Sequence, residues 1–276
     1  MKVIVTGAGG QLGTDVMKEL KKLGCEAIPA DLPELDITDK EKTIGVISGN
    51  HPDAVIHCAA FTAVDLAETE REKCRSINVD GTENIAYACR LCGAKLLYLS
   101  TDYVFGGRGD VPYETDSEIS PCNYYGETKY LGEEAVRKNG KHFIVRISWV
   151  FGKSGKNFVK TMLRLSQEKD EISVVNDQVG SPTYTPDLAS LLCKMIATEK
   201  YGTYHATNEG FCSWAEFAEK IMELSGSKTK IVPISSAEYK SAAARPENSR
   251  MSKVSLDENG FDRLPSWQDA LERYFK

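Results

Sequence analysis

Residues 3–13, Val3-Ile4-Val5-Thr6-Gly7-Ala8-Gly9-Gly10-Gln11-Leu12-Gly13, decide the fold. A short β-branched run leads directly into a glycine turn, and an amphipathic helix is predicted to follow it. This order favours a site for the phosphates of a dinucleotide, because glycines let the backbone approach the ligand and a helix N-terminus attracts anions. The spacing is Gly-x-x-Gly-x-x-Gly, through Gly7, Gly10 and Gly13. A tight turn without a ligand would need the same glycines. The position of the turn between a strand and a helix is what favours a dinucleotide site.

The first 150 residues repeat the order of strand and then helix. Strands are predicted at Lys2–Thr6, Glu26–Ala30, Ala54–His57, Lys95–Ser100 and Phe143–Ile147. Helices are predicted at Gln11–Leu23, Asp39–Ser48, Glu70–Cys92 and Tyr125–Lys138. Continuous apolar strands that alternate with helices indicate a parallel sheet covered on both faces. The prediction is therefore an α/β fold with a doubly wound, Rossmann-like sheet.

After residue 150 the alternation loosens, and we expect a smaller carboxy-terminal region. Helices are predicted at Asn157–Gln167, Pro186–Thr198, Ser213–Leu224 and near Trp267–Tyr274. Ser213 and Glu216 have the spacing of a capping box at the start of the third of these helices. Strands are predicted at Ile172–Val175, Gly202–Ala206 and Lys230–Ile234, with a polar segment over residues 240–252. Residues 1–150 are expected to form a dinucleotide-binding domain. Residues 151–276 are expected to be mainly substrate-binding, with some strands returning to the main sheet.

Composition excludes several classes of protein. The 276 residues are 41% hydrophobic and 27% charged with a net charge of −6, which is typical of a globular chain and unsuited to general nucleic-acid binding. No apolar stretch approaches the roughly 18–20 residues of a membrane helix, and the start of the chain lacks a secretory signal, so we expect a cytoplasmic protein without a membrane partner. The eight cysteines are expected to be reduced and structural, because Cys89-x-x-Cys92 has no second pair.

An acidic residue follows the second predicted strand. Asp31 lies 18 positions after Gly13, close to the ~20 residues expected for the acid that binds the cofactor ribose. A carboxylate there accepts hydrogen bonds from the ribose hydroxyls and repels a 2′-phosphate, which favours NAD over NADP. A solvated loop carboxylate is the alternative. Asp36 and Ile37 are expected on the adenine side of the cofactor by their position after the same strand.

Tyr125 and Lys129 are four residues apart on a predicted helix and therefore share one face. A phenol with a pKa of ~10 is a weak acid–base catalyst at neutral pH. An ammonium beside it favours the phenolate, so we expect Lys129 to bring the pKa of Tyr125 closer to neutral. The same lysine can hold the nicotinamide ribose. This spacing is common on ordinary helices, and the glycine turn is what favours an active-site pair here.

Two further candidates follow strands at the same edge of the sheet. Ligands of open parallel sheets bind beyond the carboxyl ends of the strands. Thr101 follows the fourth predicted strand, where its hydroxyl can donate to a substrate oxygen. Trp149 follows the fifth, and it is either a ligand platform or a core residue.

These segments together resemble the extended short-chain dehydrogenase/reductases and, more narrowly, the dTDP-4-dehydrorhamnose reductase family. The resemblance covers nearly the whole chain, and the Thr-Asp-Tyr-Val-Phe run is its most specific part. The motifs that carry it are the glycine turn, Ala59-Ala60-Phe61-Thr62-Ala63-Val64-Asp65, Ile77-Asn78-Val79-Asp80-Gly81-Thr82, Ser100-Thr101-Asp102-Tyr103-Val104-Phe105, Tyr125-x-x-x-Lys129, Arg146-x-x-Trp149, Asp177-Gln178-x-Gly180-x-Pro182-Thr183 and Arg245-Pro246-x-Asn248-Ser249.

The resemblance implies an oxidoreductase that moves a hydride from NADH or NADPH to the C4 carbonyl of dTDP-4-dehydro-6-deoxy-L-lyxo-4-hexulose, giving dTDP-L-rhamnose, and Asp31 makes NADH the preferred donor. Tyr125 is then the proton donor, Lys129 its electrostatic partner and Thr101 a hydrogen-bond donor to the same oxygen. The implied cofactor contacts are Gly7, Gly10, Gln11, Leu12, Gly13, Asp31, Asp36, Ile37, Ala59, Ala60, Phe61, Thr62, Tyr125 and Lys129. The implied substrate contacts are Thr101, Asp102, Tyr103 and Trp149. Arg245 and Asn248 are implied to meet the substrate pyrophosphate or a neighbouring loop.

The resemblance leaves a metal-linked assembly unsupported. Family members can carry glutamates at a magnesium-bridged dimer contact, but this sequence has Asp15 and Asp187 in the regions where such glutamates are expected. No metal ligands are therefore assigned, and magnesium is not supported by the sequence. A homodimer remains compatible with the resemblance.

Two other classes of function share this fold. Sugar-nucleotide 4,6-dehydratases use an Asp-Glu pair after the threonine, whereas Thr101-Asp102 is followed here by Tyr103, which counts against dehydration. Sugar-nucleotide epimerases and other ketoreductases need only the threonine, tyrosine and lysine, so they remain open. The second class is not enzymatic: a relative binds a dinucleotide as a regulatory subunit of methionine adenosyltransferase.

Overall fold

A computed structural model describes residues 1–239 and 241–276 of the chain. Its main sheet has six parallel strands in the order β10-β5-β4-β3-β1-β2. The strands are β1 (Lys2–Thr6), β2 (Glu26–Ala30), β3 (Ala54–His57), β4 (Lys95–Thr101), β5 (His142–Ile147) and β10 (Gly202–His205). The strand order reverses between β1 and β3, which makes the carboxyl ends of these two strands the expected ligand crevice. The prediction of a doubly wound α/β fold is confirmed.

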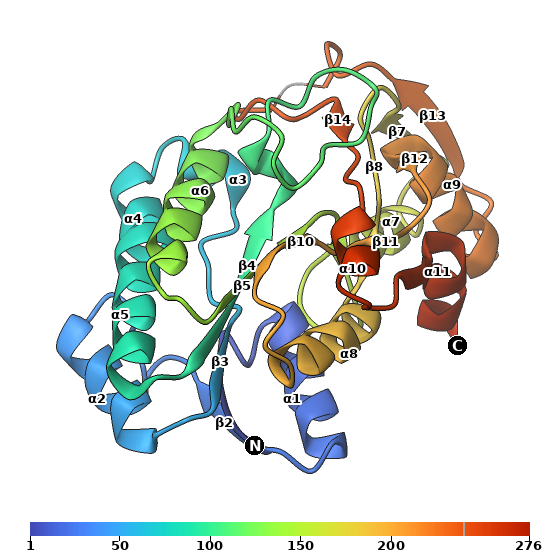
Figure 1. Ribbon diagram of the computed structural model, residues 1–276. Helices are drawn as coiled ribbons and strands as arrows, with labels where there is room; N and C mark the ends of the chain where they lie inside the picture. The colour runs from blue at the N-terminus through green and yellow to red at the C-terminus, as the bar shows by residue number, and fades with distance from the viewer. Residues whose placement is uncertain (240) are drawn as a thin grey trace.

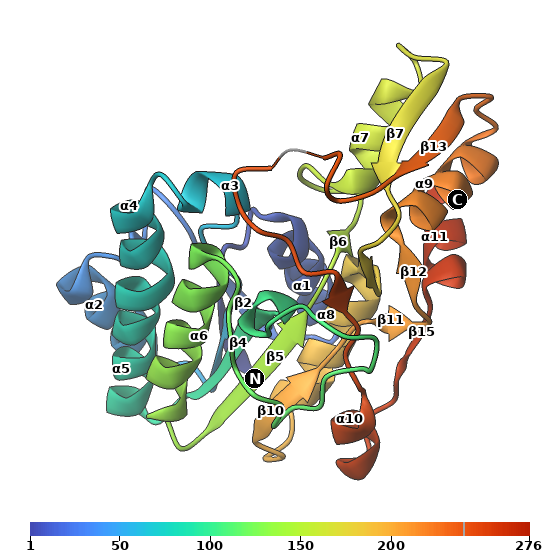
Figure 2. The same cartoon turned by 90° about the horizontal axis from the view of Figure 1, so that it is seen from above.

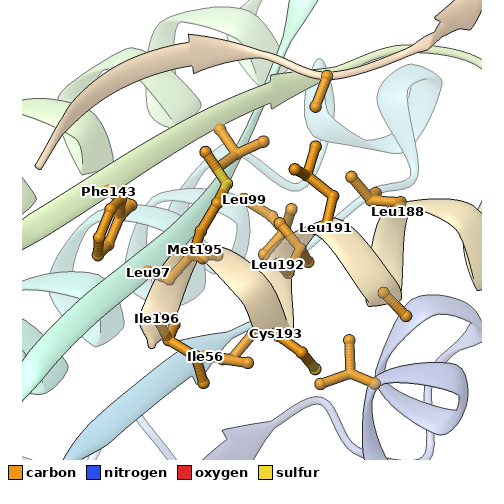
Figure 3. Close-up of a cluster of buried hydrophobic side chains, with 14 of the residues drawn as sticks. Ile56, Leu97, Leu99, Phe143, Leu188, Leu191, Leu192, Cys193, Met195 and Ile196 are labelled. Carbon is orange, nitrogen blue, oxygen red and sulfur yellow. The ribbon is translucent and has the colours of Figure 1, made fainter. Parts of the chain in front are cut away.

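Helices cover both faces of this sheet (Figure 1). One face carries α1 (Gln11–Lys22) and α8 (Thr185–Ile196). The other carries α2 (Lys40–Asn50), α5 (Thr82–Cys92) and α6 (Tyr124–Arg137). Alternate strand residues supply the two cores: Val3 and Val5 pack towards α1 and α8, whereas Ile4 packs towards α2 and α5. Figure 3 shows how Leu188 and Leu192 of α8 meet the strands in the first of these cores.

Residues 151–276 are less regular, and one of their strands completes the main sheet. The strand β10 pairs in parallel with β5 and so lies at the edge of the main sheet. The remaining short strands are β6 (Val150–Phe151), β7 (Glu171–Val175), β8 (Val179–Gly180), β9 (Thr183–Tyr184), β11 (Asn208–Glu209), β12 (Cys212–Ser213), β13 (Lys230–Ile234), β14 (Asn248–Ser249) and β15 (Leu264–Ser266). The helices are α7 (Phe158–Leu165), α9 (Trp214–Ser225), α10 (Val254–Glu258) and α11 (Trp267–Phe275). A second aromatic core lies among α7, α9 and α11.

The helix predicted over Glu70–Cys92 differs from the structure in its middle. After α3 (Val64–Ala67), the chain forms α4 (Arg71–Arg75), a π-helical turn at Ser76–Gly81 and then α5. The wide turn presents the Asn78 amide to the backbone of Phe61, whose N–H it accepts at 2.8 Å and whose carbonyl it binds at 3.1 Å. A side-chain anchor of this kind is invisible to a helix-period pattern, which explains the difference.

Helix α9 begins with the capping box expected from Ser213. The Ser213 hydroxyl accepts from the N–H of Glu216, and the Glu216 carboxylate accepts from the N–H of Ser213. The polar segment predicted over 240–252 forms no long element, and its residue 240 lies outside the described residues. Across residues 1–239 and 241–276, no helix combines the length and apolar character needed to cross a membrane.

Candidate active site

The glycine turn follows β1 and opens α1. Gly7 has φ +67°, and a Cβ on Gly13 would lie 2.0 Å from the Gly7 carbonyl oxygen, so neither position tolerates a side chain without a shift of the backbone. Gly10 is the N-cap of α1, with no side-chain cap and no acid in the first turn. The amides at the start of α1 therefore face no competing carboxylate from that turn, which suits the phosphates of a dinucleotide.

Two residues predicted to contact the cofactor are engaged within the chain. Gln11 donates to the carbonyl of Val150 at 3.2 Å and accepts from the Asn157 amide at 2.7 Å, so it joins the glycine turn to the start of the second region. The Leu12 side chain is buried in the core beside α1. A contact from Leu12 to a ligand therefore has to come from its backbone.

Asp31 lies immediately after β2 and reaches back to the glycine turn. Its two carboxylate oxygens accept from the N–H groups of Ala8 at 3.0 Å and Gly9 at 2.6 Å. The residue is half-buried at the edge of the expected crevice. A carboxylate in this place shapes the turn and also sets a negative charge beside it, which are two separable effects.

The two residues expected on the adenine side differ in exposure. Asp36 is exposed and accepts from the N–H and hydroxyl of Thr38, which holds the pKa of its carboxyl below the ordinary value. The Ile37 side chain is buried with Ile4 in the core under α2 and α5. Only its backbone is therefore placed to face a ligand.

The segment 59–62 follows β3 directly beside the glycine turn. A Cβ on Gly7 would lie 2.7 Å from the backbone nitrogen of Ala59, so the two loops are in close contact at the crossover point of the sheet. Ala60 and Thr62 are at least partly exposed, whereas Phe61 is buried and fixed through its backbone by Asn78. Asn78 is a positioning residue that the pattern of the sequence did not single out.

Thr101, Tyr125 and Lys129 lie together where β4 ends against α6. The Thr101 hydroxyl donates to Asp102 at 3.0 Å and accepts from the N–H of Tyr103 at 3.2 Å. The Thr101 side chain also partly offsets the rise in the pKa of the Tyr125 phenol. Lys129 is buried, and its ammonium lies over the Tyr98 ring, 4.0 Å from the centroid. The structure thus brings Thr101 and Tyr125 together, with Lys129 one helical turn further along α6.

The electrostatics of this group differ from the expectation. Burial raises the pKa of Tyr125 above its ordinary value, and the charge of Asp102 adds to the rise, so the expected downward shift is wrong for the described chain. Burial also lowers the pKa of Lys129 to about 7, against the opposing effect of Glu133. A phenol with a raised pKa holds its proton at neutral pH, which is the form that a proton donor needs.

Asp102 and Tyr103 begin a single 3₁₀ turn, Asp102–Val104. Asp102 is 3% exposed, and its Oδ2 has no hydrogen-bond partner among the described residues. Burial raises the pKa of Asp102 to about 6, although the hydroxyls of Ser249 and Thr101 partly offset the effect. Tyr103 packs edge-on against Tyr125 with ring centroids 5.6 Å apart. Both predicted substrate contacts therefore adjoin the catalytic candidates.

Trp149 has a strained backbone and an aromatic partner. Its φ is +49°, an uncommon value for a bulky residue. The indole stacks on Trp214, the first residue of α9, with centroids 3.6 Å apart and an interplanar angle of 11°. Trp149 therefore packs on the aromatic core of the second region, and it also lies just after β5 at the edge where a ligand is expected. Both expected roles are compatible with this position.

A buried ion pair fixes α6 to the sheet below the catalytic candidates. Arg146 of β5 donates to both oxygens of Glu133 at 2.9 and 2.8 Å, and the Ser100 hydroxyl donates to the same carboxylate at 2.6 Å. Glu133 and Arg146 are 0% and 1% exposed as side chains. Removing one partner would leave a buried charge unpaired, so the arrangement holds α6 in one register. Glu133 follows Lys129 by one helical turn, but its spacing alone did not mark it.

The two aspartates weighed as metal ligands are paired within the chain. Asp15 accepts from the Thr185 hydroxyl at 2.6 Å, and Asp187 receives both guanidinium arms of Arg273 at 2.7 Å. In the described part of the chain, no three His, Cys, Asp or Glu side chains are grouped as a metal site requires.

Fold and site together define a class. A doubly wound sheet, a glycine cradle at its crossover point and a Thr–Tyr–Lys group at the same edge are the features of a nicotinamide-dinucleotide-dependent oxidoreductase of the extended short-chain dehydrogenase/reductase type. A family model described as "RmlD substrate binding domain" matches residues 1–276. The chain belongs to the dTDP-4-dehydrorhamnose reductase family.

Individual relatives agree with this assignment. The chain is 43% identical to the spore coat polysaccharide biosynthesis protein SpsK of Bacillus subtilis, covering 100% of this chain and 97% of that protein. It is 39% identical to a dTDP-4-dehydrorhamnose reductase of Aggregatibacter actinomycetemcomitans, covering 98% and 97%. The crystal structure of a dTDP-4-dehydrorhamnose reductase from Bacillus anthracis in complex with NADP superposes with a TM-score of 0.97 at 48% identity, covering 99% and 98%. This chain is an NAD(P)-dependent oxidoreductase.

Proposed function

We propose that this chain reduces the C4 carbonyl of dTDP-4-dehydro-6-deoxy-L-lyxo-4-hexulose to give dTDP-L-rhamnose. The observation that carries the proposal is the meeting of Thr101 and Tyr125 at the end of β4, at the same edge of the sheet as the glycine turn and one helical turn from Lys129. The names of the relatives supply the substrate class, and the geometry supplies groups suited to protonating a carbonyl oxygen.

Tyr125 is the proton donor in this proposal. A hydride that adds to C4 turns the carbonyl oxygen into an alkoxide, and the phenol proton moves to that oxygen, leaving a phenolate. Burial keeps the phenol protonated before the reaction because it raises the pKa. The Thr101 hydroxyl stabilises the same oxygen once its hydrogen bond turns from Asp102 to the substrate.

Lys129 stabilises the phenolate that this step leaves behind. A pKa of about 7 makes the ammonium and the free amine comparably populated near neutral pH. The ammonium therefore favours the charged product of the proton transfer, and it can pass a proton on as the phenol is restored. Lys129 is also proposed to hold the nicotinamide ribose.

The cofactor cradle is proposed to consist of Gly7, Gly10–Gly13, Asp31, Asp36–Ile37 and the segment 59–62. Bound reduced nicotinamide supplies the hydride. The open N-terminus of α1 is suited to the pyrophosphate. A preference for NADH is proposed from Asp31, whose charge beside the turn disfavours a 2′-phosphate. The substrate is proposed to lie against Asp102, Tyr103 and Trp149.

The decisive experiment follows reduced-nicotinamide absorbance with the 4-keto sugar generated in situ on dTDP, UDP and GDP. Turnover with the dTDP sugar, confirmed by detecting the rhamnosyl product, supports the proposal. Each rival function makes a different prediction. An epimerase keeps its dinucleotide through gel filtration and interconverts sugars without net oxidation of NADH, whereas a regulatory subunit binds the dinucleotide without turnover. Either result would overturn the proposal.

A further inference from the structure

Residues 241–251, called the crossing segment below, connect the two sides of the site. Figure 2 shows this stretch passing α3, and β14 within it pairs with β8, as the labels of Figure 1 locate them. The N–H of Val179 in β8 donates to the carbonyl of Glu247 at 2.8 Å, and the N–H of Asn248 donates to the carbonyl of Gly107 at 2.9 Å. The segment is therefore tied to the second region and to the loop after β4 at once.

Asp65 holds the start of the crossing segment. Its Oδ1 accepts from the N–H of Ala243 at 3.1 Å, and its Oδ2 accepts from the Arg245 guanidinium at 2.7 Å. A second arm of Arg245 donates to the hydroxyl of Tyr103 at 3.2 Å. The side chains of Arg245 and Asp65 are 26% and 46% exposed, so the pair lies at the rim of the site.

Two routes lead from this pair to Tyr125. The first is aromatic: Arg245 fixes the hydroxyl end of Tyr103, and the Tyr103 ring packs edge-on against the Tyr125 ring. The second is the helix cap: Asn123 accepts from the N–H of Gly126 at 2.8 Å and donates to the carbonyl of Ala244 at 2.8 Å. The residue that starts the helix of Tyr125 is thus tied to the residue next to Arg245.

We propose that Arg245 and Asp65 are positioning residues, which hold Tyr125 in its donor orientation through Tyr103 and Asn123. The Arg245 guanidinium donates to Asp65 and to Tyr103, so its positive charge is already paired with a carboxylate in the chain without a ligand. The pair therefore acts on the reaction step rather than as a binding site for the substrate diphosphate. This inference rests on the proposed function for its kinetic readout.

The first test is kinetic and uses the full chain. Arg245→Gln and Asp65→Asn are each expected to lower kcat about 10-fold with KM for the nucleotide sugar within about 2-fold, since small misplacements of a reacting group cost up to ~10²-fold. The kcat of the double variant should fall no further than that of the more affected single variant, because both changes remove the same contact between Arg245 and Asp65. Arg245→Lys should recover part of kcat. Arg263→Gln and Asp257→Asn, which break a surface pair far from the Tyr125 contacts, are the matched controls and should leave both constants unchanged.

The kinetic outcomes separate the two roles of Arg245. A rise in KM with unchanged kcat in Arg245→Gln, not shared by Asp65→Asn, would identify a diphosphate contact and overturn the inference. Additive losses in the double variant would do the same. Loss of folded protein without a change in kcat per folded chain would show a stabilising role only, which also contradicts it.

The second test needs no turnover. Hydrogen exchange of the first turn of α6, residues 124–128, should be faster in Arg245→Gln and Asp65→Asn than in the wild type, with α1 and α8 unchanged. Unchanged exchange at α6 would overturn the inference. If the wild type fails to reduce the nucleotide sugar, the proposed function fails alone, and this measurement still decides whether the pair positions the start of α6.

Discussion

The glycine-turn side of the site and the crossing-segment side are built from different kinds of contact. On the glycine-turn side, the ligand-facing groups follow regular strands, and their neighbours in space are the ends of β1 and β3. On the other side, Tyr103 meets Arg245 from 142 positions away, and Trp149 meets Trp214 from α9. The first arrangement comes with the sheet, whereas the second requires the two regions to be assembled.

The difference indicates how each side responds to substitution. Under the proposed function, a change on the glycine-turn side is expected to act on dinucleotide affinity, since the sheet holds the rest in place. A change on the crossing-segment side is expected to act on the orientation of Tyr125 and of the sugar, since no single element holds that side. Tyr125 belongs to both, because α6 is fixed to β5 by Glu133 and Arg146 and capped beside Ala244. The predictions below test this division between the two sides.

The largest effect is expected for Tyr125→Phe. Removing the phenol hydroxyl removes the proton donor, so kcat should fall by about 10²-fold or more while NADH affinity stays nearly constant. The measurement is steady-state turnover beside a fluorescence titration with NADH. Tyr124→Phe, the same change one position earlier, should retain activity. Equal turnover in wild type and Tyr125→Phe would remove Tyr125 from the mechanism and break the idea that the two sides meet there.

A smaller effect is expected from Asp102→Asn. The quantity to measure is the free energy of unfolding as a function of pH. The pKa of Asp102 is raised to about 6 from 3.8 by burial. Between these values the folded chain keeps a proton that the unfolded chain has released, so this group makes the free energy of unfolding fall as pH rises through the window. The asparagine variant lacks that slope, and the difference between the two proteins should change by roughly 2 kcal/mol from pH ~4 to ~6.

The unfolding free energy of Asp102→Asn has to be subtracted from that of the wild type at each pH, because two buried histidines change stability with pH in the opposite direction. Burial lowers the pKa of His57 and of His205 to about 3, so the unfolded chain binds their protons first and stability rises with pH between about 3 and 6.5. Both histidines are present in wild type and variant, and their contribution cancels. Parallel stability curves for the two proteins would show that Asp102 is charged and solvated at the junction of the two sides.

The main sheet could be predicted because its signals are local. Each strand is a continuous apolar run that alternates with a helix, and the glycine turn between Thr6 and Gln11 fixes the first crossover. The helix over Glu70–Cys92 was predicted without its π-helical turn, since the cause is a contact between Asn78 and Phe61 that no periodicity records. The capping box at Ser213 was found because its two partners are three residues apart.

In the candidate site, too, features with local sequence signals could be predicted and features made by distant contacts could not. Tyr125 and Lys129 lie one helical turn apart, so their common face follows from spacing. The direction of the Tyr125 pKa could not be predicted, because burial is its main cause and burial is a property of the assembled fold. The pair of Arg245 with Asp65 spans 180 positions, and the stack of Trp149 on Trp214 is equally non-local. Nothing in the local pattern of either partner indicates the other.

A change of about 10-fold in affinity is expected on the glycine-turn side from Asp31→Ala. If the carboxylate binds the ribose and repels a 2′-phosphate, NADH binding should weaken about 10-fold while NADPH binding weakens less or improves. Asp31 also accepts from Ala8 and Gly9, so loss of the turn alone would weaken both dinucleotides equally. Asp31→Asn, which keeps an acceptor for the turn and removes the charge, separates the two effects. Equal shifts for both dinucleotides in both variants would show that Asp31 shapes the turn only.

The smallest effect is expected from Ser213→Ala, at the start of the helix that presents Trp214. Loss of the cap should cost about 1 kcal/mol of stability, or roughly 2–4 °C in Tm for a chain of this size. Ser266→Ala is the matched control, since Ser266 caps α11 by accepting from the N–H of Asp269. Both variants should lose similar stability and keep their NADH affinity, and only Ser213→Ala should raise KM for the nucleotide sugar, because Trp149 rests on the first residue of α9.

A fall in NADH affinity with Ser213→Ala alone would show that the second region supports the glycine turn, through contacts such as that of Asn157 with Gln11. The two sides would then be one coupled unit.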